Sequence, residues 1–453
     1  MAGGTFIAQN KVRPGAYINF KAMSAPAISV GERGVAAMPL ATGWGPDFIE
    51  LYSSELLNGK SLQKVGCTFV DSSALIYRLV LSNTYKLLIA RTDLTSAVKA
   101  SATVGNLDIT AKFKGAFGNN LSVIISAVAN VTPAVYDVTT ALNGVGKDTQ
   151  RISTLDKLVS NDWVDFALND EEDSTSPTET AGTALTGGVS GTESTESISS
   201  AIAVLATKTF NVMGVMSSES EVKTLVKTTI KQLRENEGRK CKAVLLNSAG
   251  LSGSDYEGII SCNQGYKTQD GEITAAQFIA QLTGLCAGAE LGKSLTHATI
   301  PDAIEVVGAP TSHDDIVSAL KAGWIVLSQL NDGTVIIEQD INTLCNDLTN
   351  KDDSFKKNLI INTLDEIGNT IQLTWDKTYC GKVHNNATQR TNYKAALVQY
   401  FRQLESLELI QDFDKDSDII IEQGENLDSV VVNWWVKPVD VMEKLYMTTY
   451  VNR

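Results

Sequence analysis

The sequence predicts a mixed α/β protein whose α/β layer is interrupted by an inserted all-β module. Short runs rich in Val, Ile and Thr follow one another from Thr95 to Leu168, separated by Gly, Asn and Pro, as in small β domains. From Ile198 onward, amphipathic helical segments alternate with short apolar runs, which is typical of an α/β layer with right-handed crossovers. Residues 16–93 are too few for a stable domain, so we expect them to pack with the chain after about residue 195.

Three strands and one helix are expected before the module. The alternation in Ala16–Phe20 predicts a short strand, and the apolar runs Gly34–Leu40 and Tyr85–Ala90 predict two more. Between the last two, Ser72–Leu81 is predicted to be helical, with Asp71 as its N-cap.

The β module is expected to contain strands at Asp108–Phe113, Leu121–Ala127 and Ala134–Thr140, and to end at Trp163–Leu168. The segment Asn169–Thr195 is rich in Asp, Glu, Ser, Thr and Gly. We interpret it as a solvated boundary loop rather than an acidic ligand site.

The α/β layer after the loop has a regular order of elements. In chain order we expect strand Asn211–Val215, helix Glu219–Glu235, strand Cys241–Leu246, helix Ala275–Leu291, strand Ala303–Val307, and a helix that Ser312 N-caps and that ends at Ala322. Asn331-Asp332-Gly333 then predicts a hairpin turn between Ile325–Leu327 and Thr334–Ile337.

The last part of the chain combines two long helices, Ser354–Thr378 and Tyr393–Leu407, with β-branched and aromatic strands. The expected strands are Ile419–Ile421, Val430–Val436 and, beyond Pro438, Met442–Val451. A free terminal strand either folds back onto its own sheet or adds to a sheet of another subunit, and we predict the second. Because adjacent strand residues face opposite sides, Trp434-Trp435 predicts a strand with protein on both faces, supplied by its own chain or by another subunit.

Size, charge and cysteine usage limit the classes of function. The 453 residues suggest about three domains, at ~150 residues each. The net charge of −14 argues against a nucleic-acid or anionic-membrane surface. Neither an 18-residue apolar run nor a signal-peptide core in Met1–Pro14 is present, so we expect no membrane span and no secretion signal. The six cysteines form no C-x-x-C pair and are expected to be reduced, mostly buried thiols of a cytoplasmically made protein.

The motifs of known chemistries are absent from the sequence. It contains no nucleophile elbow, zinc helix, Walker loop or dinucleotide fingerprint, and Gly144-Val145-Gly146-Lys147 lacks the spacing of a phosphate loop. A triad using one of three histidines stays open, but His313 beside Asp314 at a helix start is more typical of a surface residue. We therefore predict no catalytic residue and no cofactor.

One acidic run resembles the opening of a calcium loop. In Asp412–Asp418 the carboxylates alternate, yet Ser417 stands where the loop needs Gly, and Gln423 stands where a bidentate Glu belongs. We interpret the run as a solvated loop between a helix and a strand, and we predict no metal site.

Several stretches match a known family. They are Gln9–Phe20, Gly115–Val123, Leu185–Gly188, Thr363–Ile367, Gly381–Val383, Gly424–Asn433, Lys437–Asp440 and Met442–Met447. On these residues the chain resembles the tail sheath proteins of contractile phage tails, in the branch found in prophages and phage-like particles of Gram-positive bacteria. It departs from the family at Ala16, where Val is usual, and at the bulkier Trp434-Trp435.

The resemblance implies a subtilisin-like α/β core without protease activity, an inserted β-sandwich, a C-terminal α/β domain and extended terminal arms. The expected bounds are an N-terminal arm at 1–22, the first part of the core at 23–94, the β-sandwich at 95–190, the α/β core at 191–345, the C-terminal sheath domain at 346–436 and a C-terminal arm strand at 437–453. The resemblance also implies hexameric rings stacked helically around an inner tube. Such a sheath contracts and drives the tube through a cell envelope.

The implied partners are further copies of the chain, an inner tail tube protein, and baseplate and tail terminator proteins, without direct contact to nucleic acid or membrane. The particle would be a virion or phage-like tail assembled in the bacterial cytoplasm. Strands donated between subunits are expected at Tyr17, Ile18, Phe20, Leu445, Tyr446, Met447 and Val451, with a hinge at Lys437 and Pro438. Lys394 and Arg402 mark a helix that either faces the tube or is an ordinary surface helix. A hydrolase-like α/β enzyme and a static tube or shell protein are the alternative functions.

Overall fold

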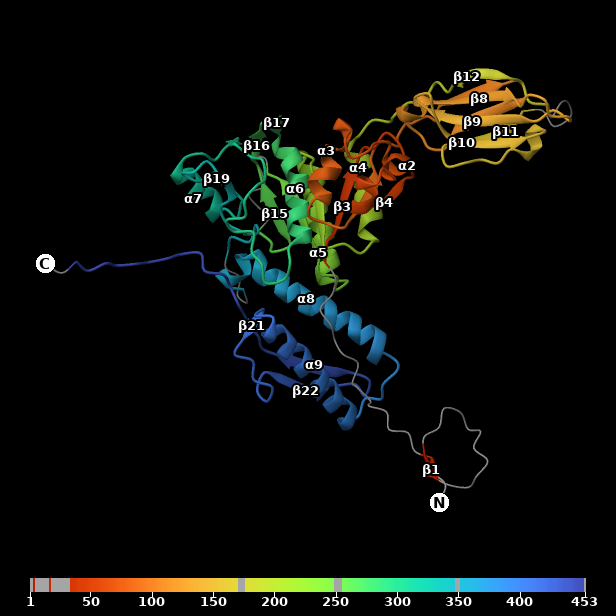
Figure 1. Cartoon of the computed structure of the whole chain (residues 1–453). Coiled ribbons are helices and arrows are strands. Elements are labelled where there is room, and N and C mark those ends of the chain that lie inside the picture. Colours follow the sequence, from red (N-terminus) through yellow and green to blue (C-terminus); the bar gives the residue numbers. More distant parts are fainter. Residues whose placement is uncertain are drawn as a thin grey trace. The chain divides into compact units, whose positions relative to one another are not determined.

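The computed structural model describes residues 3–4, 16–17, 33–169, 176–247, 255–346 and 351–451 (Figure 1). These residues fall into two compact units. The hairpin unit contains Glu366–Val439, and the core unit contains Glu32–Asp365 and Asp440–Arg453. Among the described helices, none combines the length and the apolar character that a membrane span requires.

The core unit is built on a six-stranded sheet in the order β15-β14-β13-β3-β5-β4. In chain order the strands are β3 (Val35–Leu40), β4 (Phe48–Tyr52), β5 (Lys86–Arg91), β13 (Val212–Val215), β14 (Lys242–Leu246) and β15 (Ile259–Cys262). All neighbours pair in parallel except β4 and β5, which are antiparallel. Because β3 lies between β5 and β13, one sheet joins the chain before the β module to the chain after it, and the predicted insertion is confirmed.

Helices cover both faces of this sheet. On one face lie α3 (Leu75–Leu81) and α6 (Ala275–Gly288), and on the other lie α4 (Thr195–Ala206) and α5 (Ser220–Glu235). The short helices α1 (Ser53–Leu57) and α2 (Ser61–Val65) follow β4. Strand residues are apolar on both sides, as buried parallel strands require: Met38 packs in one core cluster and Ala37 in the other. Gly288 lets α6 approach the chain after α3, since a Cβ there would lie 1.6 Å from the carbonyl oxygen of Asn83.

The inserted module is a sandwich of two sheets with the orders β10-β9-β8-β12 and β11-β7-β6. Its strands are β6 (Ser101–Val104), β7 (Leu107–Ala111), β8 (Leu121–Ala127), β9 (Tyr136–Leu142), β10 (Val145–Ile152), β11 (Val164–Leu168) and β12 (Thr180–Ala184). The sandwich has its own apolar core, which also takes in Trp44 from the chain before the module. Trp44 stacks on Trp163 at a centroid distance of 6.4 Å, and Phe113 meets its edge at 5.2 Å.

Strand β12 corrects the prediction of a boundary loop. It lies within Asn169–Thr195 and pairs antiparallel with β8, and Leu185 directly after it is fully buried. Strand β12 lies at the edge of its sheet and is exposed on one side, so it does not need large apolar residues. Its Thr, Ala and Gly residues therefore resemble those of a loop. The prediction of a solvated loop is therefore wrong for Thr180–Leu185.

The two segments that enter and leave the sandwich pair with each other, and we call this pairing the neck. Val98 and Val189 exchange backbone hydrogen bonds of 2.9 and 3.1 Å, and Ser101 and Thr186 exchange bonds of 2.9 and 3.0 Å. The neck places the ends of the inserted module side by side.

The remaining elements of the core unit are β16 (Gly265–Thr268), β17 (Gly271–Ile273), β18 (Glu305–Val307), α7 (His313–Lys321), β19 (Leu327–Gln329) and β20 (Val335–Ile337). The Ser312 hydroxyl accepts a hydrogen bond from the Asp315 backbone N–H at 3.2 Å, so the predicted N-cap of α7 is confirmed. The predicted hairpin is confirmed as β19 and β20, which pair antiparallel.

Helix α8 (Asn358–Thr374) begins in the core unit and continues into the hairpin unit. The predicted helix Ser354–Thr378 is shorter than expected, because a 3-10 turn precedes it and a π-helical turn, Trp375–Tyr379, follows it. Helix α9 (Ala387–Ser406) begins six residues before the predicted Tyr393, where the Asn386 side chain caps the Gln389 N–H. The strands of this unit are β21 (Ile410–Gln411), β22 (Ile419–Gln423), β23 (Val430–Trp434) and β24 (Lys437–Pro438).

Candidate assembly interface

The chain ends in an extended segment, Asp440–Val451, which we call the arm. It has no regular secondary structure, and the predicted arm residues Leu445, Tyr446, Met447 and Val451 are 86%, 89%, 78% and 84% exposed. Large apolar side chains at such exposure are uncommon on a monomer, and a contiguous set of them marks an interaction surface. The arm is therefore the first candidate for an assembly contact.

The predicted N-terminal donor strand lies only partly within the described residues. Ala16 and Tyr17 form strand β2, which pairs in parallel with β1 (Gly3–Gly4). Ile18 and Phe20 lie outside the described residues. The donation of this strand to a neighbouring subunit stays a prediction.

The predicted hinge residues Lys437 and Pro438 form β24, which pairs antiparallel with β21. The Lys437 ammonium lies 2.7 Å from the Asp412 carboxylate, and the Val439 N–H donates to the Leu409 carbonyl at 3.1 Å. The chain is thus held up to Val439, and the hinge stays a prediction.

A residue that the sequence did not single out fixes the arm. The Glu443 side chain is only 10% exposed, between the fully exposed Met442 and the exposed Leu445. Its carboxylate accepts hydrogen bonds from the Thr296 hydroxyl at 2.9 Å and the Gln339 amide at 2.8 Å, and it forms an ion pair with Lys357. A single acid in an apolar run was the only signal in the sequence, and the donors lie too far away in the chain to be recognised.

The electrostatics of this contact favour the ionised carboxylate. Burial alone would raise the pKa of Glu443, but the hydrogen bonds from Lys357, Gln339 and Thr296 outweigh it and lower the pKa. The neighbouring Asp340 is buried, and burial raises its pKa. Glu443 therefore stays charged and paired at neutral pH.

The β22–β23 hairpin is covered by its own chain on one face only. Trp434 packs on Phe401 of α9 at a centroid distance of 5.4 Å, whereas Trp435 is 54% exposed and Ile420 and Val431 are also exposed. Within the single chain only one face of this strand is covered, and cover of the other face by another subunit stays a prediction. In the described residues β23 pairs with β22 alone, so its other edge carries no strand.

An apolar groove lies in the hairpin unit beside β23. One hollow of about 390 Å³ and another of about 330 Å³ share Trp375, Tyr393 and Val430 in their lining. The aromatic rings in the groove contact one another: Tyr379 lies 4.6 Å from Tyr393 and 5.9 Å from Trp375 between centroids. The groove thus presents aromatic and aliphatic side chains next to an unpaired strand edge.

The two basic residues proposed to face a tube have different environments on α9. Arg402 is exposed, whereas Lys394 is half-buried. Backbone and hydroxyl hydrogen bonds from Asp416 and Ser417 lower the pKa of Asp414, and the positive charge of Lys394 adds to this effect. Lys394 therefore lies near the acidic loop, which compensates part of its charge.

The acidic loop binds its own backbone. Asp414 accepts from the Asp416 N–H at 3.0 Å and from the Ser417 hydroxyl at 3.1 Å, and Asp418 accepts from the Asp414 N–H at 2.8 Å. Across the described residues no cluster of side chains has the composition of a metal site. All six thiols are free and four of them are buried, as predicted.

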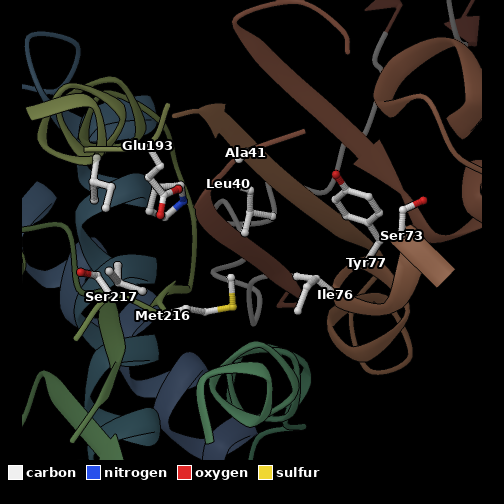
Figure 2. Close-up of a pocket in the computed structure, with 11 residues that line it drawn as sticks. Leu40, Ala41, Ser73, Ile76, Tyr77, Glu193, Met216 and Ser217 are labelled. Atoms are coloured by element: carbon white, nitrogen blue, oxygen red, sulfur yellow. The ribbon is translucent and has the colours of Figure 1, made fainter. Parts of the chain in front are cut away.

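A cavity of about 310 Å³ lies at the carboxyl ends of β3 and β13, where the strand order of the sheet reverses (Figure 2). Enzymes built on an open, mostly parallel α/β sheet bind their ligands at such a switch point. Here the lining mixes apolar side chains with the polar side chains of Glu193, Ser73, Ser217 and Tyr77, and no histidine is among them. The Glu193 carboxylate accepts a hydrogen bond from the Thr92 hydroxyl, and His313, which is exposed at the start of α7, does not line this cavity.

Comparisons with known proteins cover nearly the whole chain. The family models described as phage tail sheath protein beta-sandwich domain, central domain and C-terminal domain match residues 95–192, 191–343 and 350–452. The phage-like element PBSX protein XkdK of Bacillus subtilis is 32% identical, with 100% of both chains covered. The crystal structure of a sheath tail protein from Desulfitobacterium hafniense has a TM-score of 0.81 at 32% identity, and covers 96% of this chain and 99% of its own. The helical sheath of the anti-feeding prophage in its contracted state shares the fold, with a TM-score of 0.55 at 8% identity over 97% and 99% of the two chains.

Proposed function

Because the chain belongs to the phage tail sheath protein family, we propose that it is the subunit of a contractile sheath around an inner tube. Copies assemble as hexameric rings stacked in a helix, and the sheath then shortens and widens to drive the tube through a cell envelope. The fold shared with a sheath solved in its contracted state is the reason to expect contraction rather than a static tube. A head-to-tail interface that does not close on itself produces such a helical polymer.

The observation that carries this proposal is the arm. Its residues alternate along the backbone, so that Leu445, Met447 and Val451 share one face in an extended strand, while Tyr446 and Tyr450 share the other. Lys444–Val451 would extend about 26 Å at ~3.3 Å per residue. The arm has the length, the pattern and the exposed apolar surface of a strand donated to another subunit.

The acceptor in this proposal is the free edge of β23 in a second copy. The added strand would place its Leu445, Met447 and Val451 face over the groove lined by Trp375 and Tyr393. Each ladder hydrogen bond contributes about 0.5–1.5 kcal/mol net, and burying one such apolar side chain contributes about 1.5–3 kcal/mol. A strand of this length therefore gives a link that can hold while subunits rotate and slide as rigid bodies.

The domain bounds, the donor strand, the hinge and the partners follow the family, and the face toward the tube is a hypothesis of our own. We propose the domain bounds 1–22, 23–94, 95–190, 191–345, 346–436 and 437–453 given above. Tyr17, Ile18 and Phe20 are proposed to form the N-terminal donor strand, Lys437 and Pro438 the hinge, and Lys394 and Arg402 the face toward the tube. The proposed partners are the tube, baseplate and tail terminator proteins, in a particle assembled in the bacterial cytoplasm.

The proposal includes no enzymatic activity, and a structural role is what the family implies. The lining of the switch-point cavity supports this, since its Glu193, Ser73 and Ser217 have no histidine beside them. Contraction would draw its free energy from additional burial between subunits.

Electron microscopy of the purified full chain at high concentration tests the proposal. We expect long hollow polymers, and native particles should show the sheath in two states of different diameter. A chain that stays monomeric at high concentration would contradict the sheath role, and a single diameter before and after triggering would favour a static tube. Deletion of Val441–Arg453 should leave a folded subunit that no longer polymerises, and cooperative unfolding of this variant would show that the arm belongs to its own subunit.

A further inference from the structure

Three donors from separate segments of the core unit converge on one carboxylate of the arm. Thr296 lies in the chain after α6, Gln339 follows β20, and Lys357 directly precedes α8. We propose that these residues form a carboxylate receptor that fixes the root of the arm by binding Glu443. The receptor separates an anchored root, Asp440–Glu443, from a free segment, Lys444–Val451.

The hydrogen-bond directions within the receptor are determined by its neighbours. The Thr296 hydroxyl oxygen accepts from the Asp340 backbone N–H at 3.0 Å and from the Ser294 hydroxyl at 3.0 Å. Its own proton is therefore available to Glu443, to which it donates at 2.9 Å. The amide of Gln339 donates to the other carboxylate oxygen, Oε2, which also faces Lys357. An ionised carboxylate accepts all of these bonds, whereas a neutral amide at this position would present N–H groups to at least one donor.

The receptor holds one side chain of the arm and no other of comparable burial. The Asp440 carboxylate lies 3.8 Å from the Lys357 ammonium, and its side chain is 40% exposed. Met442 is fully exposed and Leu445 is 86% exposed. Both carboxylate oxygens of Glu443 are bound, and the residues that follow it are exposed. The arm therefore leaves the core unit at Glu443.

This point of attachment has a mechanical consequence, which rests on the proposed function. A pull on a donated strand would be taken up by Lys357 and the adjoining core unit before it reached the two-residue ladder between β24 and β21. Without Glu443, the same pull would act directly on that short ladder. The receptor would therefore protect the hairpin unit from tension during contraction.

Limited trypsin digestion of the purified full-length subunit tests the receptor without any assembly. The Lys444–Leu445 bond lies one residue beyond Glu443. A protease needs several residues on each side of the bond to be free, so the anchored root should slow the cut. Glu443→Ala is expected to raise the rate of this cut about tenfold. Glu443→Gln should raise it less, because the amide oxygen can still accept one bond, and Lys357→Met should raise it from the other side of the contact.

Asp440→Asn is the matched control, since it removes a carboxylate three residues away that makes only the long contact, and it should leave the rate unchanged. A double variant of Glu443→Ala and Lys357→Met should be cut no faster than the faster single variant. Equal cutting of wild type and Glu443→Ala, or equal acceleration by Asp440→Asn, would overturn the receptor, provided that circular dichroism shows folded subunits.

Polymerisation assays test the proposed strand donation separately from the receptor. Glu443→Ala subunits retain the donated strand and should still polymerise, whereas subunits that lack Val441–Arg453 should not. If neither variant affects polymers while the tryptic result holds, the receptor stands and the proposed strand donation fails.

Discussion

The core sheet and the arm contain the same kinds of side chains and differ in what covers them. Leu87 and Ile89 of β5 are completely buried between helices, whereas Leu445 and Val451 of the arm are 86% and 84% exposed. The net contribution of an apolar side chain to the stability of its own subunit depends on the area it buries there. Apolar residues of the arm therefore contribute little to the fold, and their hydrophobic free energy remains available for contacts with another copy.

The largest loss of stability should follow from creating a cavity in the buried core beside the six-stranded sheet. Phe278 is completely buried on α6 against the sheet. Phe278→Ala is expected to lower the free energy of unfolding by about 3–5 kcal/mol, because it removes buried area and leaves a cavity. Urea denaturation followed by circular dichroism measures the change, and a loss below about 1 kcal/mol would contradict the assignment of this face as core.

A smaller loss should separate two neighbouring residues of one strand. Trp434 packs on Phe401, and Trp435 is 54% exposed. Trp434→Ala is expected to cost about 2 kcal/mol of unfolding free energy, less than a fully buried Trp. Trp435→Ala is the matched control and should change the free energy by no more than about 0.5 kcal/mol. Equal losses of unfolding free energy for the two variants in the isolated subunit would show that burial does not distinguish Trp434 from Trp435.

The arm should show almost no effect on the fold and a clear effect on assembly. Leu445→Ala combined with Met447→Ala is expected to leave the unfolding free energy within about 0.5 kcal/mol of wild type. If the arm is buried in another copy, the same variant should raise the critical concentration for polymerisation by an order of magnitude or more. Sedimentation of polymers at a series of protein concentrations measures this, and Lys444→Ala, which changes no apolar side chain, is the control.

The smallest expected effect is the release of the arm by acid. The pKa of Glu443 is lowered in the folded chain, so the anchoring free energy is complete above the ordinary Glu pKa of about 4.3 and is lost as the pH falls through the folded pKa. Fluorescence anisotropy of a label attached at the chain end should therefore drop at acidic pH before the far-ultraviolet circular dichroism changes. In Glu443→Gln the anisotropy at neutral pH should lie below that of the wild type, because part of the anchor is lost, and it should not change with pH, because this position can no longer be protonated. The Asp340 and Asp440 carboxyl groups also lie near the receptor, and this variant removes Glu443 alone.

Periodicity and composition predicted most of the sheet and the helices. The apolar runs that became β3, β5, β13 and β14 were recognised because both of their faces are buried and they contain few polar residues. Strand β4 has an apolar pattern, Phe48-Ile49-Glu50-Leu51-Tyr52, but it is short and lies at the edge of the sheet, and it was not predicted from the sequence. Strand β12 has Thr, Ala and Gly on an exposed edge and lacks such a pattern. The start of α9 was missed because its first turns are polar and exposed, and only the cap at Asn386 marks the true beginning.

The arm could be predicted and its anchor could not. The apolar alternation around Leu445 and Met447 is visible in the sequence, and it predicts a strand without a partner. Glu443 has its role only because Thr296 and Lys357, far away in the chain, come together in the fold. The groove beside β23 likewise depends on rings from a π-helical turn and from α9, and local sequence patterns do not report such long-range contacts.

The neck also bears on how this subunit can change over time. Val98 and Val189 are partners in a backbone ladder, so the inserted sandwich begins and ends at almost the same point of the core unit. A module whose two ends meet can be enlarged, exchanged or removed while the strands on either side keep their register. The sandwich can thus be replaced, and a foreign domain inserted between the two paired segments of the neck should be carried by the same six-stranded sheet.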